Sequence, residues 1–120
     1  MRTSTIQVYR GPEQMSVCTV DQVQRTETMF ERMRGLLGAA VLKPNTGLWI
    51  SSCNSIHSFF MSFSIDVLYL DKNNTVVRVI EDMQPWRVNA CWPARSVIEL
   101  RQGQVAALGI QTGDNVNCII

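Results

Sequence analysis

Hydrophobic and polar positions alternate along much of this chain, which is typical of half-buried β-strands. Thr5–Arg10 alternates in this way, and Gly11–Gln14 carries the residues of a turn. Met15–Val23 then alternates less strictly, with its apolar residues spaced for a returning strand. The pattern therefore predicts an opening β-hairpin.

The longest predicted strand is Ser58–Leu70, whose residues are aromatic, β-branched or small, with no Gly or Pro. Its odd-numbered positions form one apolar face. Leu68 lies on the other face with Asp66, and we expect that face to be partly covered as well. Asp71–Asn74 is a strong turn, and Thr75–Ile80 returns as a strand, which predicts a second hairpin.

One stretch changes from the period of a strand to that of a helix. Thr28 and Glu31 fit a capping box, and Thr26 is the alternative cap. The apolar residues that follow recur at helical spacing and predict a helix near residues 27–37; they are Met29, Phe30, Met33, Leu36 and Leu37.

The remaining elements are short. One helical turn is predicted at Gln104–Leu108, ended by Gly109. Short strands are predicted at Leu48–Ile50, Ser96–Leu100 and Asn115–Ile119. Many short strands with one longer helix indicate an α+β domain, mostly antiparallel β, with a coiled or barrel-like sheet. The 120 residues suit a single domain over residues 1–120.

The composition narrows the class of partner. Eleven basic and 10 acidic residues give a net charge of +1, so we expect no nucleic-acid partner. No segment is apolar enough for a signal peptide or a membrane span, which favours a cytoplasmic protein with reduced cysteines. The sequence indicates no oligomeric state and no cofactor.

Cys53 and His57 are the residues that suggest chemistry. A thiol and an imidazole can act as nucleophile and base, or as two zinc-type ligands. Four residues of strand would separate them by about 13 Å, whereas a helical turn would bring them to about 5–6 Å. Asn54 and Ser55 favour a turn here. A zinc site would need a further ligand, such as Cys18, Cys91, Cys118 or a carboxylate, and we expect no metal.

Asp66 is an acid on an otherwise apolar strand. A buried carboxylate must be paired, hydrogen-bonded or protonated. The structural interpretation, in which Asp66 caps a nearby backbone or pairs with an arginine, is favoured over a chemical role.

Several motifs occur in a characteristic order along the chain. They are Arg34-Gly35-Leu36-Leu37-Gly38, Gly47-Leu48-Trp49-Ile50, Cys53-Asn54-Ser55-Ile56-His57-Ser58-Phe59-Phe60-Met61, Ile65-Asp66-Val67 and Gly109-Ile110-x-x-Gly113-Asp114. Together they resemble the domain of unknown function 192 family, also called uncharacterised protein family 0127. The family is mainly bacterial and archaeal, and its biochemical role is not established. The resemblance implies a compact β-rich fold with a helix near its start.

The resemblance transfers no catalytic assignment, but it implies that several matched residues form one connected site: Arg34, Cys53, Asn54, His57, Met61 and Asp66. The chain departs from the pattern at Ser62, where relatives often carry a basic residue. This departure weakens any anion-binding role for that face.

Two functions from different classes remain open at this point. The first is a binding or interaction module for a small molecule or peptide, built from the residues just named and Trp86. The second is a thiol-dependent hydrolase or transferase in which Cys53 is the nucleophile, His57 the base, and Asp66 or Asn54 orients the imidazole. A third possibility is that the cluster only stabilises the fold.

Overall fold

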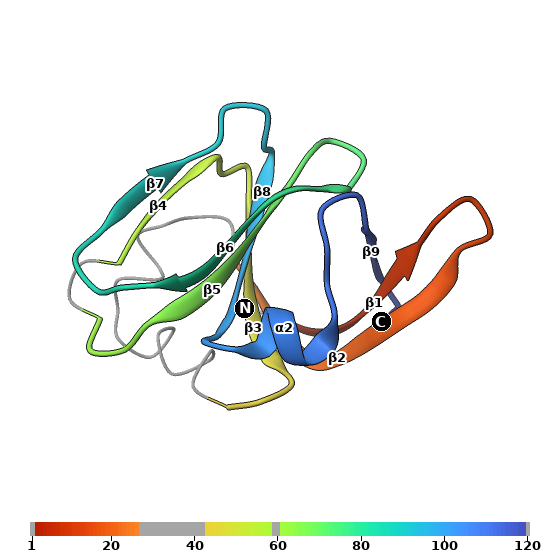
Figure 1. Ribbon diagram of the computed structural model, residues 1–120, viewed down its shortest axis with the longest axis horizontal. Coiled ribbons are helices and arrows are strands. Elements are labelled where there is room, and N and C mark those ends of the chain that lie inside the picture. Colours follow the sequence, from red (N-terminus) through yellow and green to blue (C-terminus); the bar gives the residue numbers. More distant parts are fainter. Residues whose placement is uncertain (1, 27–42, 59–60, 120) are drawn as a thin grey trace.

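The protein is built around one coiled β-sheet, seen in a computed structural model that describes residues 2–26, 43–58 and 61–119 (Figure 1). The described elements are β1 (Arg2–Arg10), β2 (Met15–Thr26), β3 (Thr46–Ser51), β4 (Ser55–His57), β5 (Ile65–Leu70), β6 (Val76–Met83), β7 (Val88–Ala90), β8 (Ser96–Arg101), α2 (Gln104–Leu108) and β9 (Asn115–Cys118).

Seven strands form the main sheet in the order β6-β5-β8-β3-β2-β1-β9, and β4 pairs with β7 in a separate two-stranded sheet. Every pair is antiparallel except β2 with β3. The edge strands β6 and β9 approach each other at the isolated bridge between Thr75 and Asn115. The predicted α+β fold with a coiled, mostly antiparallel sheet is confirmed, and the sheet does not close into a barrel.

Apolar side chains cover both faces of the central strands, because alternate residues of a strand point to opposite faces. Leu68 and Leu70 of β5 pack in a first core cluster with β1, β2 and Val105 of α2. Val67 and Tyr69 pack in a second cluster with residues of the small β4–β7 sheet. All six residues of β5 are buried, as expected for a strand covered on both faces.

Both predicted hairpins are confirmed; β1, β2 and β6 extend beyond their predicted bounds, whereas β5 is shorter than predicted. β1 and β2 pair antiparallel across the turn at Gly11–Gln14. β5 and β6 pair across the turn that begins at Asp71, whose carboxylate accepts the N–H groups of Asn73 (2.8 Å) and Thr75 (3.0 Å). Local turn chemistry fixes both hairpins.

The strand predicted over Ser58–Leu70 is wrong at Ser58 and at residues 61–64, which the structure describes outside any strand, because β5 begins at Ile65. Ile65 pairs with Met83, the last residue of β6, and with Arg101, the last residue of β8. Before Ile65 neither neighbour extends far enough to pair. The residues before Ile65 therefore have no neighbouring strand to pair with, although their composition favours β-structure.

The turn predicted around Cys53–His57 is only partly correct. The chain bends at Ser52 and Asn54, but Ser55–His57 is the strand β4, paired with β7. The predicted helix near residues 27–37, and Arg34 with it, lies outside the described residues. β2 and β3, which flank that segment, are parallel.

Gly47 shows why one glycine of β3 is needed. A Cβ atom at this position would lie 2.8 Å from Leu100 Cδ2 and 3.1 Å from the Glu99 carbonyl oxygen of β8. Any side chain here would therefore push β3 and β8 apart.

The predicted helical turn at Gln104–Leu108 is confirmed as α2. None of the helices in the described ranges is long and apolar enough to cross a membrane.

Candidate functional site

An open hollow of ≈ 420 Å³ lies at one end of the main sheet. Three connections meet there: β3 to β4, β5 to β6, and β7 to β8, all at the upper edge of Figure 1. The lining residues are Ser52, Cys53, Asn54, Lys72, Ala94 and Arg95.

Backbone hydrogen bonds hold these connections together. The Arg95 N–H donates to the Leu70 carbonyl at the end of β5 (2.7 Å), and the Arg95 carbonyl accepts the Cys53 N–H (3.0 Å). The Cys91 N–H donates to the Asn54 carbonyl (2.8 Å), which continues the pairing of β7 with β4. The hollow is therefore part of the hydrogen-bonded framework.

Among the described residues, two cations and no acid line the hollow. Lys72 follows Asp71, whose carboxylate is engaged by the backbone of its own turn. Within the described ranges, no carboxylate oxygen lies within 4.0 Å of the Lys72 or Arg95 side-chain nitrogens, and the ion pair found there joins Arg10 to Asp114. The charged side chains that the structure shows lining the hollow are therefore both positive, although the chain as a whole is close to neutral.

Cys53 is half-buried beneath the hollow. Its thiol donates to the Ser55 carbonyl (Sγ to O, 2.8 Å), and its side chain packs against the second core cluster. Tyr69 lies in the same cluster and donates to Asn89 Oδ1 (2.9 Å). Burial, together with negative charge at Cys91, raises the pKa of Tyr69 to about 12. Tyr69 is therefore a neutral structural donor at physiological pH.

Asp66 lies at the other end of β5 and faces the first core cluster. Its Oδ1 accepts the Asp82 N–H (2.9 Å), and its Oδ2 accepts the N–H groups of Gly103 and Val105 (3.0 Å each). Gly103 is the N-cap residue of α2 and has no side chain to cap the helix. Asp66 supplies that cap from β5, in agreement with the structural interpretation of this acid.

The predicted site residues therefore occupy separate places. Cys53 packs on the β4–β7 side of the sheet and Asp66 faces α2 on the other side. Cys53 is linked through Arg95 to Leu70, and Leu70 is about 13 Å along the strand from Asp66. The structure thus brings Cys53 and Asn54 together at the hollow, and it places Asp66 elsewhere.

His57, Met61 and Trp86 gather around Ser58, a buried residue that the sequence analysis did not single out. The Ser58 carbonyl accepts the N–H groups of Met61 (3.3 Å) and Trp86 (3.0 Å), and the Ser58 hydroxyl donates to the Gln84 carbonyl (2.6 Å). His57 pairs with Val88 at the end of β4 that is farther from the hollow. Trp86 is 56% exposed and does not line the hollow.

Lys72 and Arg95 are the lining residues that the sequence did not reveal. Both stand in segments recognised as a turn or a loop. Their meeting depends on the neighbouring positions of β5, β8 and β3 in the sheet, which no local pattern encodes. In the part of the chain that the structure describes, no three His, Cys, Asp or Glu residues are grouped so that they could hold a metal ion.

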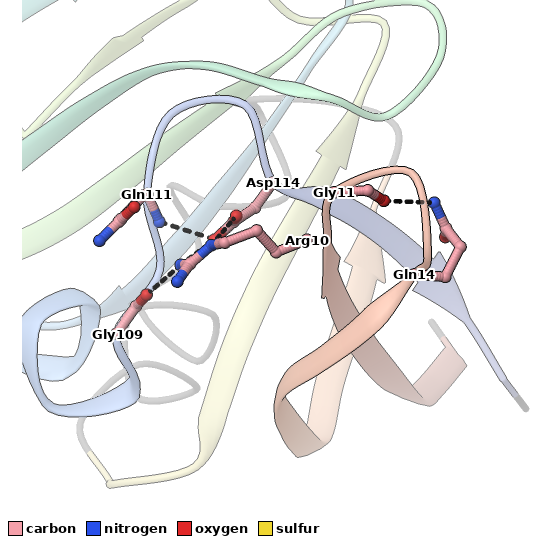
Figure 2. A network of polar contacts seen from close by, with 6 residues as sticks. All are labelled: Arg10, Gly11, Gln14, Gly109, Gln111 and Asp114. Atoms are coloured by element: carbon pink, nitrogen blue, oxygen red, sulfur yellow. Dashed lines mark hydrogen bonds and ion pairs between the residues drawn. The ribbon is translucent and has the colours of Figure 1, made fainter.

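A second polar network joins β1 to the turn before β9 and is structural. Figure 2 shows the Arg10 guanidinium directed at Asp114 and Gly109. Arg10 Nε donates to Asp114 Oδ1 (2.7 Å), and Arg10 Nη2 donates to Asp114 Oδ2 (2.9 Å) and to the Gly109 carbonyl (2.7 Å). Asp114 Oδ2 also accepts the Gln111 N–H (2.8 Å).

The electrostatics of this network follow from burial and from these partners. Burial raises the pKa of Asp114, but the Arg10 hydrogen bonds, the Gln111 N–H and the Arg10 charge outweigh burial and hold that pKa below its ordinary value. Cys18 lies nearby, and its burial, with the negative charge of Asp114, raises its pKa to about 11. These groups hold the turn in place and keep the Cys18 thiol protonated.

The comparison with protein families gives a clear result. The sequence model of the DUF192 family, described as an "Uncharacterized ACR", matches residues 12–118. The chain belongs to this family. All six residues that line the hollow lie within the matched range of this DUF192 chain.

The chain is similar to several archaeal proteins. A UPF0127 protein from Thermococcus sibiricus is 33% identical over 105 residues, which cover 80% of the DUF192 chain and 65% of that protein. A UPF0127 protein from Pyrococcus abyssi is 42% identical over 66 residues, which cover 54% and 56% of the two chains. The DUF192 chain thus spans about half to two thirds of the length of these relatives.

Two crystal structures share the fold. A protein described as a "putative transcription regulator", from Sinorhizobium meliloti 1021, superposes with a TM-score of 0.79 at 15% identity over 98% of the DUF192 chain and 94% of its own. A protein of unknown function from Novosphingobium aromaticivorans gives a TM-score of 0.73 at 19% identity over 96% and 84%. At these identities the likeness shows the fold alone.

Proposed function

We propose that this DUF192 protein is a binding module for a small molecule or peptide, and that the ligand binds in the hollow at the end of β5. The observation that carries the proposal is the hollow of ≈ 420 Å³ lined by a thiol, an amide, a hydroxyl and two cations. Its volume falls in the range of about 300–1,000 Å³ that small-molecule sites occupy.

Available polar groups support this proposal. The side chains of Asn54, Lys72 and Arg95 make no hydrogen bond to any other described residue. Ligand sites combine a concave surface with a few convergent polar groups, and these side chains meet that requirement. Of the residues proposed from the sequence, Cys53 and Asn54 lie at the hollow, whereas ligand roles for Arg34, His57, Met61, Asp66 and Trp86 remain predictions.

One observation favours a thiol enzyme as the second candidate. Cys53 shares the hollow with Lys72 and Arg95, and nearby cations favour the reactive thiolate. Against this, the Cys53 thiol donates its proton to the Ser55 carbonyl, a hydrogen bond that a thiolate cannot make. His57 as the base remains a prediction, and so does a cytoplasmic location.

The binding proposal is tested by screening a library of small fragments against the ¹⁵N-labelled full chain and following backbone amide shifts. We expect saturable shifts concentrated at Ser52–Asn54, Lys72 and Ala94–Arg95, because these amides surround the hollow. Lys72→Trp, which places a bulky side chain at an exposed lining position, should abolish or weaken them, whereas Ala106→Trp on the exposed side of α2 should not. Hits confined to the loop around Trp86, or no saturable hits, would refute the hollow as the binding site.

A further inference from the structure

We propose that the ligand of the hollow carries an oxyanion, a carboxylate or a phosphate, that Arg95 and Lys72 bind together. This inference rests on the proposed function and specifies the chemistry of the same site. The two cations come from different connections, β7 to β8 and β5 to β6, and both line one hollow that has no acid among its described lining residues. The oxygens of one oxyanion can accept charge-assisted hydrogen bonds from both cations.

The backbone beneath Arg95 is fixed, while its side chain is exposed. Its N–H and carbonyl are bound to Leu70 (2.7 Å) and Cys53 (3.0 Å). The guanidinium has no hydrogen-bond or ion-pair partner among the described residues. A planar guanidinium on a fixed backbone is suited to bidentate binding of a carboxylate or phosphate.

Lys72 is presented in a comparable way. The Asp71 carboxylate accepts the N–H groups of Asn73 and Thr75. The Asp71 carbonyl accepts the Asn74 N–H (3.0 Å) and the Asp71 N–H donates to the Thr75 carbonyl (3.0 Å), so four hydrogen bonds close the turn that carries Lys72. The same bonds occupy the Asp71 carboxylate with its own turn. Lys72 thus supplies a second positive charge with no carboxylate oxygen within 4.0 Å in the described part of the chain.

Neutral groups complete the arrangement. The Cys91 N–H donates to the Asn54 backbone carbonyl (2.8 Å), which fixes the backbone of Asn54 beside the hollow. The Asn54 side-chain amide can donate to a ligand there. The Ser52 hydroxyl is exposed at the same rim. Donors therefore outnumber acceptors at this surface, which suits an acceptor-rich anion. Ser62, the position that lacks the family's usual basic residue, does not line this hollow.

The test is a titration of the ¹⁵N-labelled full chain with sodium phosphate and, separately, with sodium succinate, while sodium chloride holds the ionic strength constant. We expect saturable amide shifts at Ser52–Asn54, Lys72 and Arg95 with one or both probes. Arg95→Gln and Lys72→Gln should each weaken binding about tenfold, the effect of losing one charge-assisted hydrogen bond. Arg101→Gln, at the opposite end of β8, is the matched control and should bind like the wild type.

The two arms distinguish the sources of the anion, because saturation with succinate alone indicates a carboxylate and saturation with phosphate alone indicates a phosphate. Shifts that do not saturate, or that Arg95→Gln and Lys72→Gln leave unchanged, would overturn the inference. If neutral fragments bind the hollow while both anions fail, the oxyanion is refuted and the binding module stands. If no probe of any charge binds there, both proposals fail.

Discussion

The two ends of strand β5 use polar groups in opposite ways. At the Asp66 end, a fully buried carboxylate accepts three backbone N–H groups, from Asp82, Gly103 and Val105. At the Leu70 end, the exposed side chains of Lys72 and Arg95 line a hollow and pair with no other described residue. One strand, only six residues long, connects these two environments.

This difference separates structural from functional polar residues. A buried polar group that is fully satisfied holds elements together, and its loss leaves several partners without hydrogen bonds. An exposed polar group fixed only through its backbone contributes little to stability and can bind a ligand. On this criterion, Asp66 is structural and the Leu70 end is the place to look for function.

The largest expected effect is the loss of stability in Asp66→Ala. Removing the carboxylate leaves three N–H groups without their acceptor, those of Asp82 and Gly103, which are partly buried, and that of Val105, which is buried. Each unsatisfied buried group costs about 1–3 kcal/mol. We therefore expect the free energy of unfolding, measured by urea denaturation, to fall by about 3 kcal/mol or more. Glu81→Ala, an exposed carboxylate on the neighbouring strand β6, should change it by less than about 0.5 kcal/mol.

A loss in Asp66→Ala no larger than that of Glu81→Ala would break the comparison, because Asp66 would then not be the acceptor that holds α2 to β5. A variant that unfolds completely would agree with it. Asp66→Asn keeps one acceptor oxygen and replaces the other with a donor NH₂ group, so we expect a smaller loss than for alanine.

An intermediate loss of stability is expected when the ion pair between Arg10 and the buried carboxylate of Asp114 is removed. Arg10→Met should destabilise the protein near neutral pH. Because the pKa of Asp114 is lowered in the folded state, its contribution is present above the unfolded value of about 3.9 and is lost as the pH falls through the folded value. The stability difference between wild type and Arg10→Met should therefore shrink in acid.

Thermal melts at a series of pH values provide this measurement, with Arg101→Met as the control for loss of an arginine. A difference between wild type and Arg10→Met that stays constant from neutral to strongly acidic pH would show that Arg10 acts through packing of its stem. In that case the ion pair shown in Figure 2 contributes nothing measurable.

The smallest expected difference is in the rates at which two cysteines are alkylated in the folded protein. It is also the difference most informative about function. Cys18 should react slowly with iodoacetamide until the pH approaches about 11, the value to which burial raises its pKa. Cys53 lines the open hollow and should be labelled faster in the folded protein. Peptide mass spectrometry measures both rates in one sample, and Cys18 is the internal reference.

The same experiment in His57→Ala separates the two candidate functions. In a binding module, the labelling rate of Cys53 is unchanged by this substitution. Fast labelling well below pH 8 that slows in His57→Ala would indicate an activated thiolate, and the thiol enzyme would replace the binding module. Labelling that requires a chelator would instead indicate a metal bound at Cys53.

Local signals accounted for much of the fold. Gly11–Gln14 and Asp71–Asn74 specify turns by their own side chains and backbone preferences, so both hairpins were predictable. The start of β5 was not predictable from local sequence. β5 begins at Ile65 because its neighbours β6 and β8 end at the residues that pair with Ile65. The strands β4 and β7 were missed for the same reason, as each has three residues and depends on the other.

The candidate site was less predictable than the fold. Cys53 and Asn54 were found because their residue types suggest chemistry and a turn, and both signals can be read from the local sequence. Lys72 and Arg95 are ordinary residues in ordinary loops, and only the order of strands in the sheet places them side by side. Asp66 was chosen for its unusual setting, but an acid on an apolar strand is equally the signature of a helix cap supplied from a distant element.

The pairing of β9 with β1 has a consequence for how the chain folds. This ladder joins Ile6 to Cys118, almost the full length of the chain, so it can form only after the rest of the sheet. Folding slows as contacts become more distant in sequence, and we expect β9 to dock late. Until it does, the outer edge of β1 stays unpaired, which makes the β1–β2 hairpin the part of the nascent chain most exposed to aggregation.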